Sequence, residues 1–395
     1  MARLSYDELE KIKLRFNVDK LWSWSKMNTF INSKYEYLLK YILKVKEDRC
    51  DSCYTTLGTI CHDTLDAFYE GKIKYEDMID NYNDGFTTAI IIANLKFNRS
   101  DEEKNKSIGE KYNDNLIHFF KNHVPYKHKL LIEKPIVVNI SDEKENNVFV
   151  GYIDALYKDE DGYVYPIDFK SSSIYTGDKL KENSGQLILY SIGLNQIGIP
   201  LDKLKPCFNF LKYCTVQYQL KKGDIKYRNV ERCKLGESLQ SNAKTWLKHF
   251  GYKSDDYLKE MLDTNSIDCL PEEVKEKYVI TDCHVPVELN EEIVKKWINH
   301  ITVTLKDIEL REQDYEETKS DKCFWDDEES IRKQEYYYSN LCSYSSYKLL
   351  PYKAFLEKKE TQQNGDIFGN LLGSTTSKVI ETKNNELDLS WLDSL

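Results

Sequence analysis

The chain has 395 residues, of which 41% are hydrophobic and 31% charged, and its formal net charge is −10. This length suffices for one large domain or two ordinary ones, and the apolar fraction allows a sizeable core. No apolar run approaches the roughly 18 residues of a membrane-spanning helix, and the first residues lack the apolar stretch of a secretory signal, so we expect a cytoplasmic protein with no membrane partner.

Residues 1–125 are predicted to be helical. Between Trp24 and Tyr41, apolar and aromatic residues recur at helical spacing. A second helix is expected from Thr56 to Phe68, and helices continue to His123. The second helix carries His62, which follows Gly58 in a Gly-x-x-x-His pattern. A lone histidine is more often structural than a ligand, so both interpretations are open at this point.

An α/β core is predicted for residues 126–235, and it begins with a strand at Leu130–Ile140. Two β-rich runs, Val148–Tyr157 and Tyr163–Lys170, then flank the sequence Asp-Glu-Asp-Gly, which is typical of a β-hairpin. With Gly162 in the left-handed position of a three-residue loop, Asp159 faces the first residue of the second run.

The register of this hairpin brings two carboxylates and an ammonium together. Counting back along the ladder places Asp154 directly opposite Asp168, and strand alternation puts Lys170 on the same face as Asp168. Opposed like charges repel, so the arrangement needs a reason. A divalent cation such as Mg²⁺ supplies one, because it prefers oxygen ligands and neutralises charge that develops on a phosphodiester. The alternative is a surface hairpin whose charged side chains are only solvated.

Beyond the hairpin, Gln186 and Tyr190 lie one turn apart on an expected helix, and therefore on one of its faces. Two further strands are predicted at Cys207–Tyr218 and Lys226–Cys233. From Gly236 to Leu310 the pattern is helical again, and residues 236–359 are predicted to form a helical part that packs on the core. Residues 360–395 are predicted to be a flexible linker followed by a docking peptide, because the linker has little apolar surface.

Three motifs follow one another closely and in order, namely Gly151-Tyr-Ile-Asp154, Ile167-Asp-Phe-Lys170 and Gln186-Leu-Ile-Leu-Tyr190. In these motifs the sequence resembles the PD-(D/E)XK nuclease superfamily, and specifically its RecB-like exonuclease branch, which is related to AddB-type and CRISPR-adaptation nucleases. The resemblance implies a restriction-endonuclease-like α/β core with a mixed central sheet, flanked by helices from the N-terminal and C-terminal parts.

The resemblance also implies roles for the residues of these motifs. Asp154 and Asp168 would bind Mg²⁺ or Mn²⁺ and take part in catalysis, and Lys170 would be the catalytic lysine. Gln186 and Tyr190 match a Gln-x-x-x-Tyr motif of the branch and would complete the catalytic set.

Two further residues are candidate metal ligands. His62 matches the branch's histidine motif, in which the imidazole is an additional ligand. Glu133 lies where the family often has a glutamate on the strand before the hairpin, and for Glu133 an active-site role and a structural role are equally open.

Several relatives in this branch hold an iron–sulfur cluster through cysteines at both ends of the chain. Here Ser33 and Lys34 replace the Cys-Pro of the N-terminal motif, and Cys342 is the one cysteine of three that the C-terminal run keeps. Four thiolates are normally needed to hold a [4Fe–4S] cluster. We therefore predict that the iron–sulfur cysteines are largely lost and that no cluster is bound.

The tail carries apolar anchors after the predicted linker. Leu387, Leu389, Trp391 and Leu392 suit a short peptide that docks in a pocket of another protein. The Leu-Asp-Leu step resembles the sliding-clamp-binding peptides of bacterial and phage replication proteins. A tail helix that packs on its own domain is the alternative.

The resemblance implies a Mg²⁺- or Mn²⁺-dependent deoxyribonuclease, an exonuclease of DNA recombination, repair or phage replication in a bacterial or phage-infected cell. A structure-selective or flap endonuclease with the same site is the alternative enzyme, and a catalytically idle interaction or inhibitor protein is the alternative without chemistry. The negative net charge does not exclude DNA, because the electrostatic footprint is local. Candidate basic segments are Lys40–Lys46, Lys121–Lys129, and Lys179 with Lys181.

Overall fold

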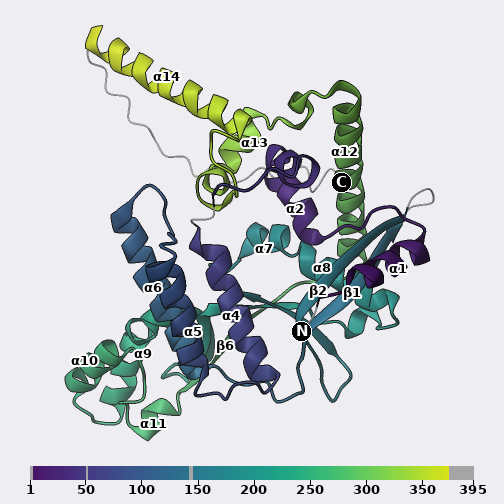
Figure 1. Ribbon diagram of the computed structural model, residues 1–395. Coiled ribbons are helices and arrows are strands. Elements are labelled where there is room, and N and C mark those ends of the chain that lie inside the picture. The colour runs from purple at the N-terminus through teal and green to yellow at the C-terminus, as the bar shows by residue number, and fades with distance from the viewer. Residues whose placement is uncertain (1–2, 50–51, 142–145, 373–395) are drawn as a thin grey trace. The chain divides into compact units, whose positions relative to one another are not determined.

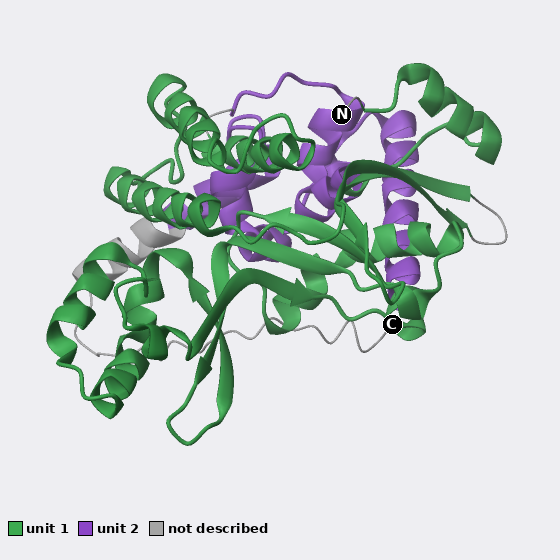
Figure 2. Cartoon of the chain, turned by 90° about the horizontal axis from the view of Figure 1, so that it is seen from below, with its two compact units in different colours: residues 1–24, 50–294 green, residues 25–49, 295–395 purple. Residues whose placement is uncertain are grey.

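The computed structural model describes residues 3–49, 52–141 and 146–372. The chain divides into two compact units, shown in different colours in Figure 2: unit 1 comprises residues 1–24 and 50–294, and unit 2 comprises residues 25–49 and 295–395. The boundaries that the sequence suggested near residues 125 and 235 both fall within unit 1. The predicted docking peptide, with Leu387, Leu389, Trp391 and Leu392, lies outside the described residues.

Unit 1 is built on a six-stranded mixed sheet, which confirms the predicted α/β class. Strands β1 (Leu131–Ser141), β2 (Asn146–Lys158) and β3 (Val164–Lys170) are successive antiparallel neighbours. Strand β4 (Cys207–Gln219) pairs with β3 in parallel, and β5 (Ile225–Glu231) pairs with β4 antiparallel.

The sixth strand corrects the sequence prediction. Strand β6 (Tyr278–Pro286) pairs antiparallel with β4, although the segment from Gly236 to Leu310 was predicted to be helical throughout. Its residues Val279, Ile280 and Thr281 are β-branched and favour a strand. The run is short and helices precede and follow it, so the helical periodicity of the longer segment concealed it.

Three helices cover one face of the sheet through a shared hydrophobic cluster. They are α4 (Cys53–Tyr69), α5 (Met78–Thr87) and α6 (Glu102–Asn122), which lie side by side in Figure 1. The strand residues of this cluster include Ala155 of β2 and the pair Ile167 and Phe169 of β3. Because successive strand residues point to opposite faces, Asp168 and Lys170 lie on the other face of β3.

Helix α8 (Gly185–Gln196) packs directly on β1. A Cβ at Gly193 would lie 2.7 Å from a side-chain atom of both Ile136 and Val138, so only glycine allows this close approach. Every residue from Ser184 to Leu194 is buried except Gln186, which is half-buried. A helix that is buried all round belongs to the interior, and α8 therefore fixes the position of its polar residues firmly. Helix α7 (Gly177–Asn183) leads into it.

The far part of the sheet has its own hydrophobic cluster. Helices α9 (Leu235–His249), α10 (Ser254–Thr264) and α11 (Glu272–Lys275) pack on it, and the strands contribute Cys214, Val216, Val230, Tyr278 and Ile280. A buried charge network joins the end of α6 to β6: Asp282 lies 2.6 Å from His123 Nδ1 and 2.5 Å from an Arg232 nitrogen. Burial opposes the ionised form of Asp282, but these two partners hold its pKa below the usual range.

Unit 2 is helical. It contains most of α2 (Trp24–Asn32) and α12 (Glu291–Thr318), together with α3 (Lys34–Tyr37), α13 (Glu328–Lys333) and α14 (Leu350–Leu372). Asp326 organises it, because this buried carboxylate accepts hydrogen bonds from the Ser33 hydroxyl and the Tyr338 hydroxyl. Helix α14 continues to Leu372, where the sequence predicted a linker from residue 360. None of the described helices is both long and apolar enough to cross a membrane.

Candidate metal centre

The hairpin of β2 and β3 has the predicted register. The pairs run from Lys158–Val164 to Ala155–Ile167, and Gly162 in the loop has a φ of +81°. The same register places Asp154 opposite Asp168. The ladder pairs end at Ala155–Ile167, and the Phe169 N–H donates a hydrogen bond of 2.9 Å to the carboxylate of Asp154. Asp154 is therefore held by the backbone of the neighbouring strand.

Glu133 stands in the same row on the next strand. The flanking pairs Ile132–Ala155 and Lys134–Ile153 place it opposite Asp154, so Glu133, Asp154 and Asp168 cross three adjacent strands in line. Glu133 has a φ of +49°, which is rare for a residue with a Cβ and unusual inside a strand. Such backbone strain costs about 1–3 kcal/mol and tends to gather at functional sites.

His62 reaches the carboxylates from α4. Its Nε2 lies 3.1 Å from the Phe169 carbonyl oxygen, and its Nδ1 lies 3.7 Å from the Asp154 carboxylate. The carbonyl can only accept, so Nε2 carries a proton, as assigned from this hydrogen bond, and Nδ1 is the nitrogen left to bind a metal beside Asp154. A backbone acceptor on the second nitrogen is the usual partner of a metal-ligating histidine.

These residues form a set with the geometry of a metal site. One ligand atom each from His62, Glu133 and Asp154 lie within 4.8 Å of one another. Burial and the charge of Asp168 raise the pKa of Asp154 well above its usual range. Crowded, buried carboxylates of this kind are stabilised by a divalent cation, and the imidazole and carboxylate donors suit one. The residues present therefore fit a bound divalent metal.

Asp168 and Lys170 lie beside this set. The Lys170 ammonium is 2.5 Å from the buried carboxylate of Asp168 and 5.9 Å from the centre of the Phe208 ring. Burial lowers the pKa of Lys170, but the carboxylates of Asp168 and Asp154 outweigh this and raise it above the usual range. Lys170 is thus a fixed positive charge, and Asp168 is paired with it outside the three-residue set.

Gln186 and Tyr190 meet on one face of α8, as predicted. The Gln186 side-chain amide donates to the Tyr190 hydroxyl at 3.1 Å. Tyr190 packs over Gly151 of β2, where a Cβ would lie 2.5 Å from the ring. The glycine of the Gly-x-x-Asp motif therefore has a steric reason, because it makes room for the tyrosine three residues before Asp154 on the strand. Burial raises the pKa of Tyr190, which stays a neutral hydroxyl.

One acidic residue near the set was not identified from the sequence. Asp66 lies one turn after His62 on α4, and burial together with the charge of Glu133 raises its pKa to about 7. The spacing of four residues from His62 is the signal that places both on one helix face.

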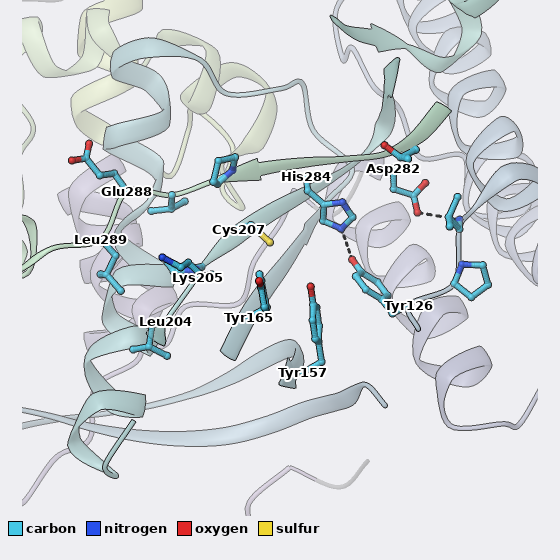
Figure 3. Close-up of a pocket in the computed structure, with 16 residues that line it drawn as sticks. Tyr126, Tyr157, Tyr165, Leu204, Lys205, Cys207, Asp282, His284, Glu288 and Leu289 are labelled. Carbon is cyan, nitrogen blue, oxygen red and sulfur yellow. Dashed lines mark hydrogen bonds between the residues drawn. The ribbon is translucent and has the colours of Figure 1, made fainter. Parts of the chain in front are cut away.

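A separate cavity of about 800 Å³ opens at the other end of β3 (Figure 3). Aromatic residues line it, among them Tyr126, Tyr157 and Tyr165, and the Tyr126 hydroxyl lies 2.6 Å from His284 Nε2. None of the residues predicted to be functional lines this cavity, so it is not the metal centre.

The positions of the predicted iron–sulfur motif lie in unit 2. The Ser33 hydroxyl accepts a hydrogen bond from the Glu36 N–H at the start of α3 and is buried. Cys342 is also buried, which raises the pKa of its thiol and disfavours the thiolate.

The fold and this centre define an α/β protein with an acidic, metal-binding site on a mixed sheet. Residues 21–324 match the model of the PD-(D/E)XK nuclease superfamily, and the chain belongs to that superfamily. PD-(D/E)XK nucleases use divalent metals, and membership indicates a metal-dependent nuclease. Among solved structures, the chain is similar to one titled "Crystal structure of SSO0001", with 13% identity over 52% of this chain and 76% of the other, at a TM-score of 0.18. No curated protein sequence matches the chain.

Proposed function

We propose that this protein is a Mg²⁺- or Mn²⁺-dependent DNA exonuclease of the RecB-like branch. The observation that carries the proposal is the convergence of His62, Glu133 and Asp154 within 4.8 Å beside the Asp168–Lys170 pair. The three ordered motifs of the hairpin and α8 support the assignment to the branch, because each contributes a residue to the same place.

The proposed metal ligands are His62, Glu133, Asp154 and Asp168. A divalent cation bound there would supply Lewis-acid stabilisation of charge on the phosphodiester. Phe169 positions two of the ligands from its backbone, since its N–H holds Asp154 and its carbonyl orients His62. The helix and the hairpin thereby approach the same point, joined through the backbone of Phe169.

Lys170 is the proposed catalytic lysine. Its ammonium is held by Asp168 and remains charged, so it can donate hydrogen bonds to a non-bridging phosphate oxygen as negative charge develops. Tyr190 and Gln186 border the centre from α8. Their hydroxyl–amide pair is suited to position a substrate group or a water molecule, because both side chains are already fixed by their mutual hydrogen bond.

The proposal includes no iron–sulfur cluster, since Ser33 acts as a helix cap and Cys342 is a buried thiol. It places the enzyme in DNA recombination, repair or phage replication. The sequence of the tail supports recruitment by a sliding clamp or another replication protein through Leu389 and Trp391. A pull-down that compares the full chain with Trp391→Ala tests this recruitment, and equal capture by both would exclude it.

The decisive test is digestion of end-labelled linear single- and double-stranded DNA beside circular DNA, with Mg²⁺, Mn²⁺ or EDTA. An exonuclease degrades the linear substrates from an end, spares the circle and stops in EDTA. Cleavage of the circle would make the protein an endonuclease with the same centre. Cleavage that persists in EDTA, or none with either metal, would refute the metal-dependent function.

A further inference from the structure

The loop and edge strand that follow β4 form a cationic surface on an acidic protein. All residues from 221 to 229 are exposed. They include four cations and one carboxylate, which gives a local charge of +3 in a chain whose net charge is −10. The cations are Lys221, Lys222, Lys226 and Arg228, and no ion pair with them is found among the described residues. We call residues 221–229 the cationic hairpin.

The cationic hairpin also exposes an aromatic ring. Tyr227 is 70% exposed and stands between Lys226 and Arg228 in the sequence. It pairs with Gln217 of β4, which pairs in turn with Val279 of β6, and Val279 is 49% exposed. This row is an uncovered face of the sheet, because α9 to α11 pack on the opposite face through Val216 and Ile280.

This uncovered face is on the same side of the sheet as the catalytic lysine. Lys170 lies against Phe208, and Phe208 pairs with Val285 of β6. Alternation along β6 keeps Val285 and Val279 on one side, and directly paired residues share a face, so Tyr227 joins them. Six residues of strand separate Val285 from Val279, which is about 20 Å. That distance corresponds to about six stacked nucleotides at about 3.4 Å each.

We propose that the cationic hairpin and Tyr227 bind single-stranded DNA about six nucleotides from the metal centre. A base stacks on the Tyr227 ring, and the phosphates lie over the outer edge of β5, toward Lys226 and Arg228, which alternation places on the other face of this edge strand. Sequence-independent binding of single strands typically combines a cationic track with aromatic stacking of this kind. The inference rests on the proposed function, because it supplies that nuclease with its substrate class.

Another explanation exists for charges at this place. β5 pairs with β4 alone among the described strands, so it is an edge, and edge strands often carry lysine to prevent pairing with another molecule. Protection of the edge works with positive or negative side chains, and it gives no role to the Tyr227 ring. Charge reversal therefore separates the two, because glutamate at Lys226 and Arg228 still protects the edge but repels phosphate.

The test is DNA binding by fluorescence anisotropy in EDTA, where no cleavage occurs, with the full chain. The probes are labelled oligothymidylates of about 20 and about 5 nucleotides, since only the longer spans the distance derived above. The variants are Tyr227→Ala, Tyr227→Phe and the double reversal Lys226→Glu/Arg228→Glu. The matched control is Lys244→Glu/Lys248→Glu, which makes the same change in net charge at exposed lysines of α9, the helix that packs on the opposite face of the sheet. Thermal unfolding verifies that each variant is folded.

We expect Tyr227→Ala to weaken binding of the longer probe about 5- to 100-fold, with Tyr227→Phe close to wild type, because a base stacks on the ring. The double reversal should also lower the slope of log affinity against log salt by about 1.4, or about 0.7 for each lost phosphate contact. The short probe and the control variant should change little. Equal losses for both probes, equal losses in the control, or no loss in Tyr227→Ala would each overturn the inference. The binding assay does not measure cleavage. A negative result in the nuclease assay would therefore refute the proposed function without deciding whether Tyr227 and the cationic hairpin bind DNA.

Discussion

Substituting Asp154 with asparagine and with alanine separates two properties of this carboxylate. In the proposed centre its charge serves the metal, and its oxygen accepts the hydrogen bond from the buried Phe169 N–H. Asparagine keeps an acceptor and removes the charge, whereas alanine removes both. A buried N–H without an acceptor costs about 1–3 kcal/mol. In EDTA, Asp154→Asn should therefore be about 1–3 kcal/mol more stable than Asp154→Ala.

The structure also predicts whether Asp154→Asn is more or less stable than the wild type. Burial and the neighbouring Asp168 make the ionised form of Asp154 unfavourable without a metal. Asp154→Asn should thus be at least as stable as wild type in EDTA. A saturating divalent ion should reverse the order, because an ion at 100 times its dissociation constant stabilises the folded wild type by about 2.7 kcal/mol and the variant loses this gain.

Urea unfolding in EDTA and in Mn²⁺, followed by circular dichroism, measures both effects, and cleavage of labelled DNA should be lost in both variants. Equal stability of Asp154→Asn and Asp154→Ala in EDTA would contradict the proposed role of the Phe169 hydrogen bond. Undiminished Mn²⁺ stabilisation in Asp154→Asn would show that the ion binds elsewhere.

Three further predictions follow from the same centre. Gly151→Ala should lower the free energy of unfolding by about 1–3 kcal/mol, because the new Cβ overlaps the Tyr190 ring, and the loss should shrink in a Tyr190→Ala background. Gly58→Ala is its control, since a Cβ there meets Ser171 at an ordinary 3.7 Å, and an equal loss would contradict the steric argument. Lys170→Ala should slow the cleavage step about 100- to 1000-fold in single-turnover kinetics while DNA affinity in EDTA stays nearly unchanged; a loss confined to affinity would make Lys170 a binding residue. Asp66 has its pKa raised to about 7 from the usual 3.8, so the folded state holds its proton more tightly and stability in EDTA should fall as the pH rises from about 4 through 7. Asp66→Asn should reduce this fall in the free energy of unfolding by about 1–2 kcal/mol over the pH range, allowing for solvent screening of a partly exposed group. The same pH dependence as wild type in urea unfolding would refute the prediction.

The sequence predicted the hairpin register because the information is local. Gly162 sets the loop geometry, alternation sets the faces, and together they determine which residue stands opposite Asp154. The same holds for Gln186 and Tyr190, whose spacing alone places them on one helix face. The geometry of a motif that lies within one element, or within two adjacent elements, can therefore be predicted from the sequence.

Features that depend on residues far away in the sequence could not be predicted in the same way. His62 is oriented by Phe169, which is 107 residues away, and nothing near His62 in the sequence encodes that hydrogen bond. Glu133 had no local sign of its left-handed backbone, which arises where β1 meets β2 at Asp154. Strand β6 was missed because its main partner, β4, lies far earlier in the chain and supplies the ladder that stabilises a short β-branched run.

Several residues at the metal centre depart from the usual preferences for backbone conformation, burial of charge and protonation. A glutamate inside a strand has a left-handed φ, an aspartate is buried opposite another, and Asp66 on the neighbouring helix is held partly protonated at neutral pH. Each of these features lowers stability in the absence of a cation, and a positive ion held by His62, Glu133 and Asp154 would offset the repulsion between the carboxylates. Sequences keep such conflicts mainly where function requires them. We therefore expect metal binding and folding stability to be coupled in this protein, and since the ligands must lose their protons to bind, affinity for the ion should rise with pH across the range in which Asp154 titrates.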